Sequence, residues 1–413
     1  MTSLNTVWLL ICGTLVFFMQ AGFAMLETGF TRAKNAGNIV MKNIIDICIG
    51  APVFFFIGFG LMFGKNCGFI GNLDLFIRDD YTSLLPDRVS LCSFVFYQIT
   101  FCATAATIVS GAMAERTKFS AYCIYSVIIS MFVYPIVGHW IWGGGWLSKL
   151  GFHDFAGGTV VHTVGGMAAL MGAKIVGPRI DKYDKNGRGK AIPGHNIILG
   201  ALGIMILWFG WFGFNAGSSL KADGLAAHAF MTSGISAASA LLSWMLIDTL
   251  ISKKTTLVGA STGLVVGLVA ITPGAGFVPI WASFIIGALV SPICYFGVSL
   301  IKKKLKIDDA LDAFGCHGIG GIWGGIATGI FTQKSINSTA KWDGLIFGDY
   351  HLFAAQIVGI LVTAAVAVVG TLICVAIVRL FTTLRVDKCE EQLGLDISQH
   401  GESAYPSFNG LDQ

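Results

Sequence analysis

Charged residues are scarce in this sequence. Asp, Glu, Lys and Arg make up 12% of the 413 residues, whereas about a quarter of a typical soluble domain is charged. The sequence also lacks a phosphate-binding glycine loop, a cluster of metal ligands and a nucleophile beside a base, which excludes an ATPase or a hydrolase. Because 54% of the residues are hydrophobic, the chain is expected to be a membrane protein that uses no cofactor and is not an enzyme.

Long apolar runs define the predicted fold. Most reach about 20 residues, the length that a helix needs to cross a hydrocarbon core ~30 Å thick, so the spans are predicted to be helices rather than barrel strands. We predict an all-α polytopic membrane protein with eleven transmembrane helices. The predicted spans are 4–25, 39–63, 90–114, 119–137, 157–176, 197–214, 225–251, 257–271, 280–300, 314–331 and a long final run, 352–380.

Basic residues are distributed unevenly between the two sides of the predicted helices. Of the 27 Lys and Arg, twenty fall on one side and seven on the other. Because basic loops stay in the cytoplasm, the N-terminus is expected outside the plasma membrane and the C-terminus inside. The ten cysteines lie largely within the spans, where they act as small apolar residues, and only Cys67 is predicted on the outer side.

One sequence motif occurs twice, 155 residues apart. An ionisable side chain within a span is costly and is by default a candidate for an ion or proton pathway. The two glycines that follow each His allow close approach of helices. The copies of the motif are Asp154, His162, Gly165 and Gly166, and then Asp309, His317, Gly320 and Gly321.

The duplicated motif predicts an inverted repeat. Five spans per unit is an odd number, so the second unit must enter the membrane from the opposite side. Each His lies eight residues, or ~12 Å, into its helix, so both are expected near the bilayer midplane. The predicted organisation is a transmembrane domain, 1–384, with repeats at about 1–178 and 194–332 and a final helix at about 349–384, followed by a cytoplasmic tail, 385–413.

Simpler interpretations exist for these residues. A single buried His is more often a packing residue, although two at matching positions of a repeat favour a functional pair. Asp154 is typical of a helix N-terminal cap, because a carboxylate there meets free N–H groups. Asp309, with Asp308 and Asp312 close by, is expected to be structural too. Trp142 lies near Trp140 and Trp146, a pattern that also fits an interfacial aromatic belt.

Two further predictions concern the inner side. Lys42 and Asp46, four residues apart on one span, are predicted to form an ion pair. The tail is expected to pack across the cytoplasmic face and to touch a neighbouring subunit, rather than to end as a disordered terminus. The tail residues expected to pair with the basic inner loops are Asp387, Lys388, Glu390, Glu391 and Asp396.

Seven segments of the sequence resemble the ammonium transporter family, the Amt/Mep/Rh superfamily, and in particular its Amt branch. The resemblance runs from near the first residue to the last ten, with the blocks in the expected order on the expected spans. The segments are GFAMLETGFTRAKNAGN (22–38), TFCATAATIVSGAMAERTKFSA (100–121), HWIWGGGWL (139–147), HDFAGGTVVHTVGG (153–166), WFGFNAGS (211–218), ALDAFGCHGIGGIWG (310–324) and LGLDISQHGESAY (393–405).

The resemblance implies a role for each candidate residue. His162 and His317 would form a twin-histidine pair, bonded through ring nitrogens, in a narrow apolar pore. Phe101 and Phe214, otherwise unremarked among 31 Phe, would form a gate of two rings above the pair. The residues expected to recruit the ion at the outer face are Trp142, Ser218 and Tyr97, with Asp154 supporting them from behind and Asp309 structural as well.

The resemblance also implies a function and an assembly. Members are homotrimers with one pore per subunit, and many are closed from the cytoplasm by trimeric PII-type signalling proteins. We expect transport of ammonium that loses its proton near the entrance, because neutral ammonia is far cheaper to bury in an apolar channel. The alternative is an ammonium sensor with little flux, although such sensors usually carry an appended signalling domain. Trp142 and Ser218 suit a cation entrance and disfavour a channel for carbon dioxide.

Overall fold

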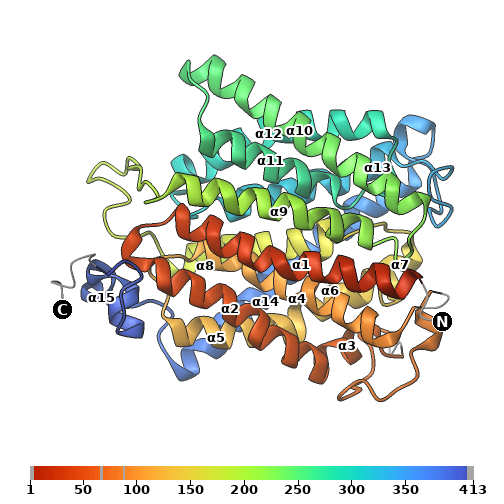
Figure 1. The fold of residues 1–413 in the computed structure, drawn as a ribbon, viewed down its shortest axis with the longest axis horizontal. Helices are drawn as coiled ribbons and strands as arrows, with labels where there is room; N and C mark the ends of the chain where they lie inside the picture. Colours follow the sequence, from red (N-terminus) through yellow and green to blue (C-terminus); the bar gives the residue numbers. More distant parts are fainter. Residues whose placement is uncertain (1–3, 66–67, 87–88, 407–413) are drawn as a thin grey trace.

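The helices of this chain run side by side along one long axis (Figure 1). The computed structural model describes residues 4–65, 68–86 and 89–406, so Cys67 and the tail residues 407–413 lie outside the described residues. The described residues are largely helical and contain no strand beyond two isolated bridges. Nine helices in this part of the chain are long and apolar enough to cross a membrane, with α11 as a shorter apolar helix. The predicted all-α membrane class is confirmed.

Helix is present in each predicted span of the first half. Pro135 is the second residue of α6, just after the π-helical turn η4, in line with the clash between a proline ring and the carbonyl four residues before it. The elements are α1 (Leu4–Gly29), η1 (Ala33–Asn35), α2 (Ala36–Val53), η2 (Phe54–Gly58), α3 (Phe59–Phe63), η3 (Thr82–Leu84), α4 (Leu91–Ala112), α5 (Phe119–Ile128), η4 (Ile129–Val133), α6 (Tyr134–Ile141), α7 (Trp146–Leu150), η5 (Gly158–Thr163) and α8 (Val164–Val176).

The second half is helical in each predicted span as well. The span predicted at 314–331 consists of a π-helical turn, η7, followed by α13. The elements are α9 (Ile197–Gly217), α10 (Gly224–Ser252), α11 (Leu257–Ile271), α12 (Ile280–Leu300), η6 (Ile301–Leu305), η7 (Phe314–Ile319), α13 (Gly320–Phe331), η8 (Leu345–Phe347), α14 (His351–Phe381), α15 (Lys388–Leu393) and η9 (Asp396–His400).

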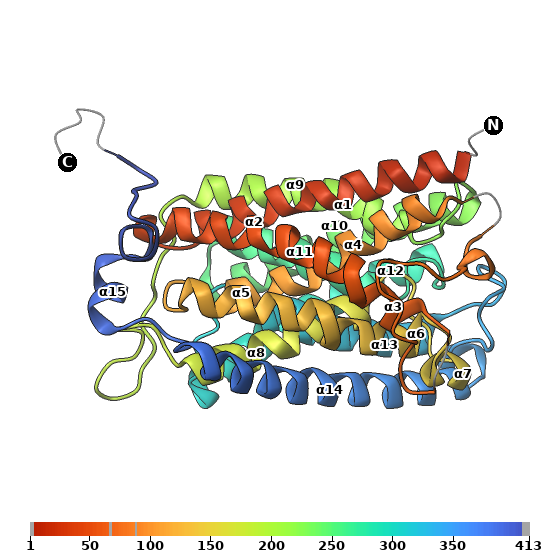
Figure 2. The ribbon, with the colours of Figure 1, turned by 90° about the horizontal axis from the view of Figure 1, so that it is seen from below.

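The chain begins and ends at opposite ends of the bundle. Helix α1 begins at one end, whereas α15 lies across the other, which we call the tail end; the opposite end is called the far end (Figure 1). Helix α14 runs along the length of the bundle and ends at the tail end (Figure 2). Its 31 residues make it the longest of the described helices.

The helices of the two halves pack in corresponding pairs. Helix α1 packs along α9, and these two are the first helices of the predicted repeats. Helix α4 packs on α8 as α11 packs on α13, and α13 contacts η5 as α8 contacts η7. Helix α14 packs against α5, α8 and α13. This arrangement places the turns η5 and η7 against each other in the interior.

Basic side chains at the tail end are held in buried ion pairs. Glu115 Oε2 accepts from Arg32 Nε at 2.9 Å and lies 3.2 Å from Arg179 Nη1. Arg179 Nε in turn lies 2.8 Å from Asp308 Oδ2. Burial alone would raise the pKa of Asp308, but the hydrogen bonds and charge of Arg179 outweigh it and hold this pKa well below its ordinary value. The network therefore stays charged and joins loops of both halves.

The tail folds back onto the tail end of the bundle. The Asp396 carboxylate accepts from the backbone N–H of Gly37 at 3.0 Å and of Asn38 at 2.8 Å, in the first turn of α2. The Glu391 carboxylate accepts from the backbone N–H of Ile180 at 2.7 Å, in the loop after α8. The tail thus connects two loops that are far apart in the sequence.

Glu391 binds a basic inner loop, as expected, but through the backbone N–H of Ile180 and not through a basic side chain. Glu391 pairs with Arg385 of the tail itself, at 2.6 Å, and Asp396 binds backbone amides. Lys34 does reach the tail, but its Nζ donates to the main-chain carbonyls of residues 391 and 392. The first N–H groups of a helix have no partner within it, so they compete with basic side chains for a carboxylate.

The predicted ion pair of Lys42 and Asp46 is wrong. The Asp46 carboxylate accepts from Tyr122 Oη at 2.7 Å and from Ser126 Oγ at 3.0 Å, both on α5. Lys42 Nζ lies 5.1 Å from the centroid of the Tyr122 ring and 3.5 Å from the Ser110 carbonyl oxygen. Spacing along α2 placed the two residues on one face, but hydroxyl groups of a neighbouring helix occupy the carboxylate.

Candidate functional site

Two histidines meet in the interior of the bundle. His162 on η5 and His317 on η7 have their Nδ1 atoms 3.2 Å apart, and their ring centroids are 5.1 Å apart. His162 is 0% exposed and His317 is 5% exposed. A hydrogen bond between two ring nitrogens needs one donor and one acceptor, so a neutral pair holds a single proton between its facing Nδ1 atoms. Either ring can be the donor.

Asp154 fixes the start of the helical segment that carries His162. Its Oδ1 accepts from the backbone N–H groups of Gly157 and Gly158, both at 2.8 Å. Its Oδ2 accepts from those of Thr159 at 2.7 Å and Val160 at 3.0 Å. One carboxylate therefore satisfies four N–H groups that have no partner within the helix. Asp154 is a cap, as its position before the apolar run predicted.

Asp309 occupies the corresponding place before His317. Its Oδ1 accepts from the backbone N–H of Ala313 at 3.0 Å and its Oδ2 from that of Phe314 at 2.7 Å. The two Asp residues of the duplicated motif thus have the same structural use, each setting the position of a His eight residues later. Neither carboxylate contacts an imidazole ring in the hydrogen bonds of the described residues.

Glycines let the two histidine-bearing segments cross in contact. A Cβ atom on Gly166 would lie 2.2 Å from the backbone nitrogen of Gly318, and one on Gly321 would lie 2.6 Å from the carbonyl oxygen of Gly158. Such distances are too short for any side chain, so the backbones touch at both positions. Gly166 and Gly321 are equivalent in the motif, and the two contacts flank the histidine pair on opposite sides.

Aromatic rings form a file from the far end to the histidine pair. The Trp142 ring lies 6.0 Å from that of Phe101, measured between centroids. Phe101 and Phe214 stack at 4.0 Å with an angle of 19° between their planes, and Phe214 lies 5.5 Å from the His162 ring. Rings stacked at 4.0 Å are in van der Waals contact. No space is therefore left between these two rings.

Tyr97 and Ser218 lie beside the stack. The Tyr97 ring is 4.7 Å from that of Phe101, and its hydroxyl lies 2.9 Å from the Phe214 carbonyl oxygen and 3.2 Å from Ser218 Oγ. The Ser218 hydroxyl donates to the same carbonyl at 2.9 Å, so its oxygen keeps lone pairs for another donor. The predicted outer-site residues are thus all grouped around Phe101 and Phe214.

Trp142 is oriented by the segment that Asp154 caps. Its Nε1 donates to the Asp154 carbonyl oxygen at 2.8 Å. The indole N–H is therefore already used, and what remains available to a cation is the face of the ring. The side chain of Asp154 lies behind this contact and binds backbone amides, so the same residue positions both Trp142 and the start of η5.

Two residues next to the pair had no predicted role. Trp211 stacks on His162 with centroids 5.0 Å apart, and its Nε1 donates to Thr272 Oγ1 at 2.9 Å. Phe23 of α1 lies 6.3 Å from the His317 ring. The sequence did carry a signal for Trp211, which is three residues before Phe214 and hence on the same helix face. Phe23 has no comparable signal, because its contact depends on how α1 packs.

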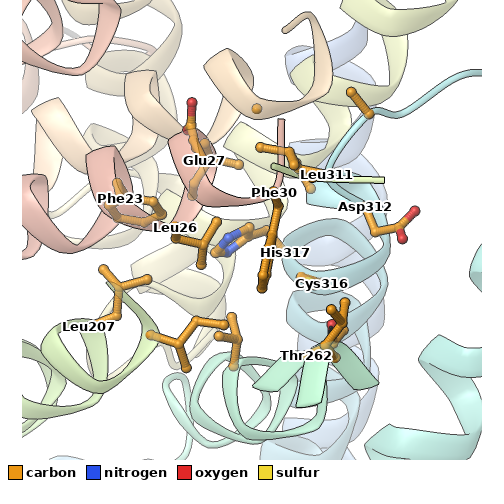
Figure 3. A pocket seen from close by; sticks show the side chains of 18 of the residues that line it. Phe23, Leu26, Glu27, Phe30, Leu207, Thr262, Leu311, Asp312, Cys316 and His317 are labelled. Carbon is orange, nitrogen blue, oxygen red and sulfur yellow. Dashed lines mark hydrogen bonds between the residues drawn. The ribbon is translucent and has the colours of Figure 1, made fainter. Parts of the chain in front are cut away.

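A cavity opens on the other side of the pair, toward the tail end. It has a volume of about 270 Å³. Figure 3 shows His317 at its wall, together with labelled side chains of α1, α9, α11 and the segment around η7. Among its lining residues are Phe23, Glu27, Leu207, Thr262 and Cys316. The histidine pair therefore lies between a closed aromatic stack and an open space.

Comparison with known proteins identifies the family of this chain. The Ammonium Transporter Family matches the chain over residues 7–405. The chain belongs to the ammonium transporter family. It is 43% identical over 408 residues to an ammonium transporter of Bacillus subtilis, covering 97% of this chain and 98% of that protein. It is also 43% identical over 418 residues to ammonium transporter Amt2 of Archaeoglobus fulgidus, covering 97% of this chain and 88% of the relative.

Solved structures of this family share its fold. A structure named Sensor Amt Protein matches with a TM-score of 0.88 and 38% identity, over 96% of this chain and 98% of that one. Mep2 of Saccharomyces cerevisiae matches with a TM-score of 0.86 and 33% identity, over 97% of this chain and 90% of that one. The family resemblance seen in the sequence is confirmed.

Proposed function

We propose that this member of the ammonium transporter family conducts ammonium, as ammonia and a separately moved proton, along the file from Trp142 to the cavity beside His317. The observation that carries the proposal is a buried, hydrogen-bonded pair of histidines between an aromatic stack and a cavity. An apolar file excludes the hydrated ion, and the pair is the polar group along it that can exchange a proton.

The entrance lies at the far end in this proposal. The face of Trp142 offers a cation roughly 0.5 to 2 kcal/mol of attraction, and the Ser218 oxygen adds an acceptor. Intact ammonium would lose nearly all its hydrogen bonds beyond Phe101, whereas ammonia loses far less. The ion therefore gives up its proton before the stack, and a ring movement of Phe101 or Phe214 admits ammonia.

The relay between the histidines moves the proton. His162 Nε2 is buried and has no hydrogen-bond partner among the described residues, so it is free to bind a water molecule or ammonia. A proton that arrives at this nitrogen allows the shared Nδ1 proton to pass to the other ring, and His317 then releases a proton toward the cavity it lines. The relay returns to its starting state when both imidazole rings return to their original tautomers.

A flux measurement tests the proposal against its alternative. Because one similar solved structure is named Sensor Amt Protein, the second candidate is a sensor that binds ammonium with little flux. Purified protein in proteoliposomes should give a rapid, saturable current when ammonium is added, together with a proton flux. Binding without current would support the sensor and would contradict transport.

Two substitutions at the entrance should weaken recruitment. Trp142→Leu and Ser218→Ala are each expected to raise the half-saturating ammonium concentration, because the ring face and the hydroxyl acceptor are lost. For Trp142→Leu the loss of binding free energy is up to ~2 kcal/mol, which corresponds to about a thirtyfold rise in that concentration. The maximal current should change less. The measurement is current against ammonium or methylammonium concentration. Wild-type half-saturation in both variants would place recruitment elsewhere.

The orientation and assembly are further parts of the proposal. The tail end would face the cytoplasm, which is supported by the twenty basic residues on that side. Two inverted five-helix repeats are supported by the paired packing of α4 on α8 and α11 on α13. A homotrimer with a PII-type partner at the tail end remains an expectation from the family, and crosslinking of the membrane-embedded protein would test the trimer.

The tail should support conduction through the start of α2. Asp396→Ala removes the acceptor of two N–H groups in the first turn of α2, so it is expected to lower the melting temperature and the ammonium current. Deletion of residues 386–413 should do the same more strongly, without preventing membrane insertion, and should change the response to a PII-type partner.

Asp387→Ala is the matched control for the tail. Asp387 caps α15 itself and accepts from the Glu390 N–H at 2.8 Å. The substitution therefore removes a tail carboxylate without removing the cap of α2. A current reduced in Asp396→Ala but not in Asp387→Ala would support coupling through α2. If the deletion transports and responds to the partner as the full chain does, the tail has no such role.

A further inference from the structure

Resting on the proposed function, we infer that Glu27 forms a second cation site, in the cavity on the tail side of the histidine pair, where ammonia that has passed His317 is held again as ammonium. Glu27 is 2% exposed and lies in the wall of the 270 Å³ cavity that His317 also lines. Figure 3 shows both side chains at this cavity.

The hydrogen bonds of Glu27 leave one of its oxygens for a ligand. Ser110 Oγ donates to Oε2 at 2.9 Å and Asn43 Nδ2 donates to the same atom at 3.2 Å. Both bonds recorded for the carboxylate thus go to Oε2 and fix its orientation. Oε1 lies beside Gly111, 3.5 Å from where a Cβ of that residue would stand, and Gly111 also lines the cavity. Absence of a side chain at residue 111 therefore leaves space next to Oε1.

The buried charges around Glu27 favour a monovalent cation. Lys42 and Asp46 lie on α2 and are both 0% exposed, and Ser110 connects the group, since its carbonyl oxygen is 3.5 Å from Lys42 Nζ while its hydroxyl binds Glu27. Two carboxylates and one ammonium group carry a net charge of −1 when ionised. One bound cation balances this charge, which is costly to leave uncompensated in a buried site.

The site lies one helical turn beyond the relay. Phe23 and Glu27 are four residues apart on α1 and hence on the same face, ~6 Å apart along the axis. Phe23 lies 6.3 Å from the His317 ring, so Glu27 follows it toward the tail end. A cation at Oε1 would also have the Phe23 ring nearby. The order from the far end is then aromatic entrance, histidine pair and acidic exit.

Asp312 is a less suitable ligand in the same cavity. It lines the wall as well, but its Oδ1 lies 2.6 Å from Lys302 Nζ and both side chains are partly exposed to solvent. A carboxylate that already has a basic partner gives little net attraction to a second cation. Glu27 combines burial, a fixed orientation and a free oxygen.

Thallium(I), a monovalent cation close in size to ammonium, tests the site directly. Crystals of the full chain soaked in thallium(I) nitrate should show an anomalous peak beside Glu27 Oε1. The peak should be lost in Glu27→Gln, which keeps the shape and the acceptor for Ser110. It should weaken in Gly111→Ala, which puts a methyl group beside Oε1 without changing charge. Asp312→Asn is the matched control, since it removes an equal charge from a cavity residue that is already paired with Lys302, and should keep the peak.

Transport from each side supplies the second measurement. In inside-out membrane vesicles, Glu27→Gln should raise the half-saturating ammonium concentration about tenfold, in keeping with loss of one charge-assisted hydrogen bond. In right-side-out vesicles it should stay near the wild-type value. Absence of a thallium peak in the wild type, or a peak that persists in Glu27→Gln, would overturn the site. A wild-type protein without ammonium current but with a Glu27-dependent peak would contradict the proposed transport and leave the cation site in place.

Discussion

His162→Ala and His317→Ala are each expected to remove normal ammonium conduction while leaving the fold intact. The relay needs two facing nitrogens, which lie 3.2 Å apart in the native pair, and either substitution leaves one. A positioned proton-transfer group typically contributes ~100-fold or more to a rate, so a loss of that order in ammonium current is expected. The measurement is current in proteoliposomes, with potassium as the competing ion.

A third buried histidine provides the control for this prediction. His139 is 0% exposed and its Nδ1 lies 2.9 Å from the Met62 carbonyl oxygen, so it is a packing histidine with a backbone partner. His139→Ala should lower stability without changing the proton coupling of the current. Wild-type current and unchanged selectivity against potassium in His162→Ala or His317→Ala would exclude the relay.

The sequence predicted the fold and the depth of the two histidines because both depend on periodic, local features, whereas contact between the two rings was implied by the family resemblance. Apolar runs of membrane length are helical whatever their neighbours. The duplicated motif places an Asp cap, a His and a Gly pair at fixed intervals, and helix geometry then sets the depth of each His. The close approach at Gly166 and Gly321 follows from the same pattern.

Contacts between distant helices were not predictable in the same way. Lys42 and Asp46 had the spacing of an ion pair, yet hydroxyl groups of Tyr122 and Ser126 occupy the carboxylate. The local sequence of α2 does not indicate which face of α5 packs against it. The role of Glu27 has no local signature, because it depends on a cavity that α1, α9 and α11 enclose together.

Asp154→Ala should be the most damaging single substitution at the outer side of the site. Four buried backbone N–H groups lose their acceptor at once, and each unsatisfied group costs ~1–3 kcal/mol. Even with partial rearrangement, we expect a loss of several kcal/mol in stability, seen as a lower melting temperature in detergent. Asp309→Ala is the comparison, because Asp309 serves two N–H groups and should cost less.

Asp154→Ala should also weaken the recruitment of ammonium, and this effect can be measured separately from the loss of stability. The Trp142 indole is bound to the Asp154 backbone carbonyl, so a shift of the uncapped segment moves the ring away from Phe101. In vesicles kept well below the melting temperature, Asp154→Ala should therefore raise the half-saturating ammonium concentration as Trp142→Leu does, and a double variant should add little to either. Asp309→Ala should leave this value unchanged, since it caps the segment on the tail side. A variant that melts and saturates like the wild type would show that the four hydrogen bonds do not hold the entrance in place.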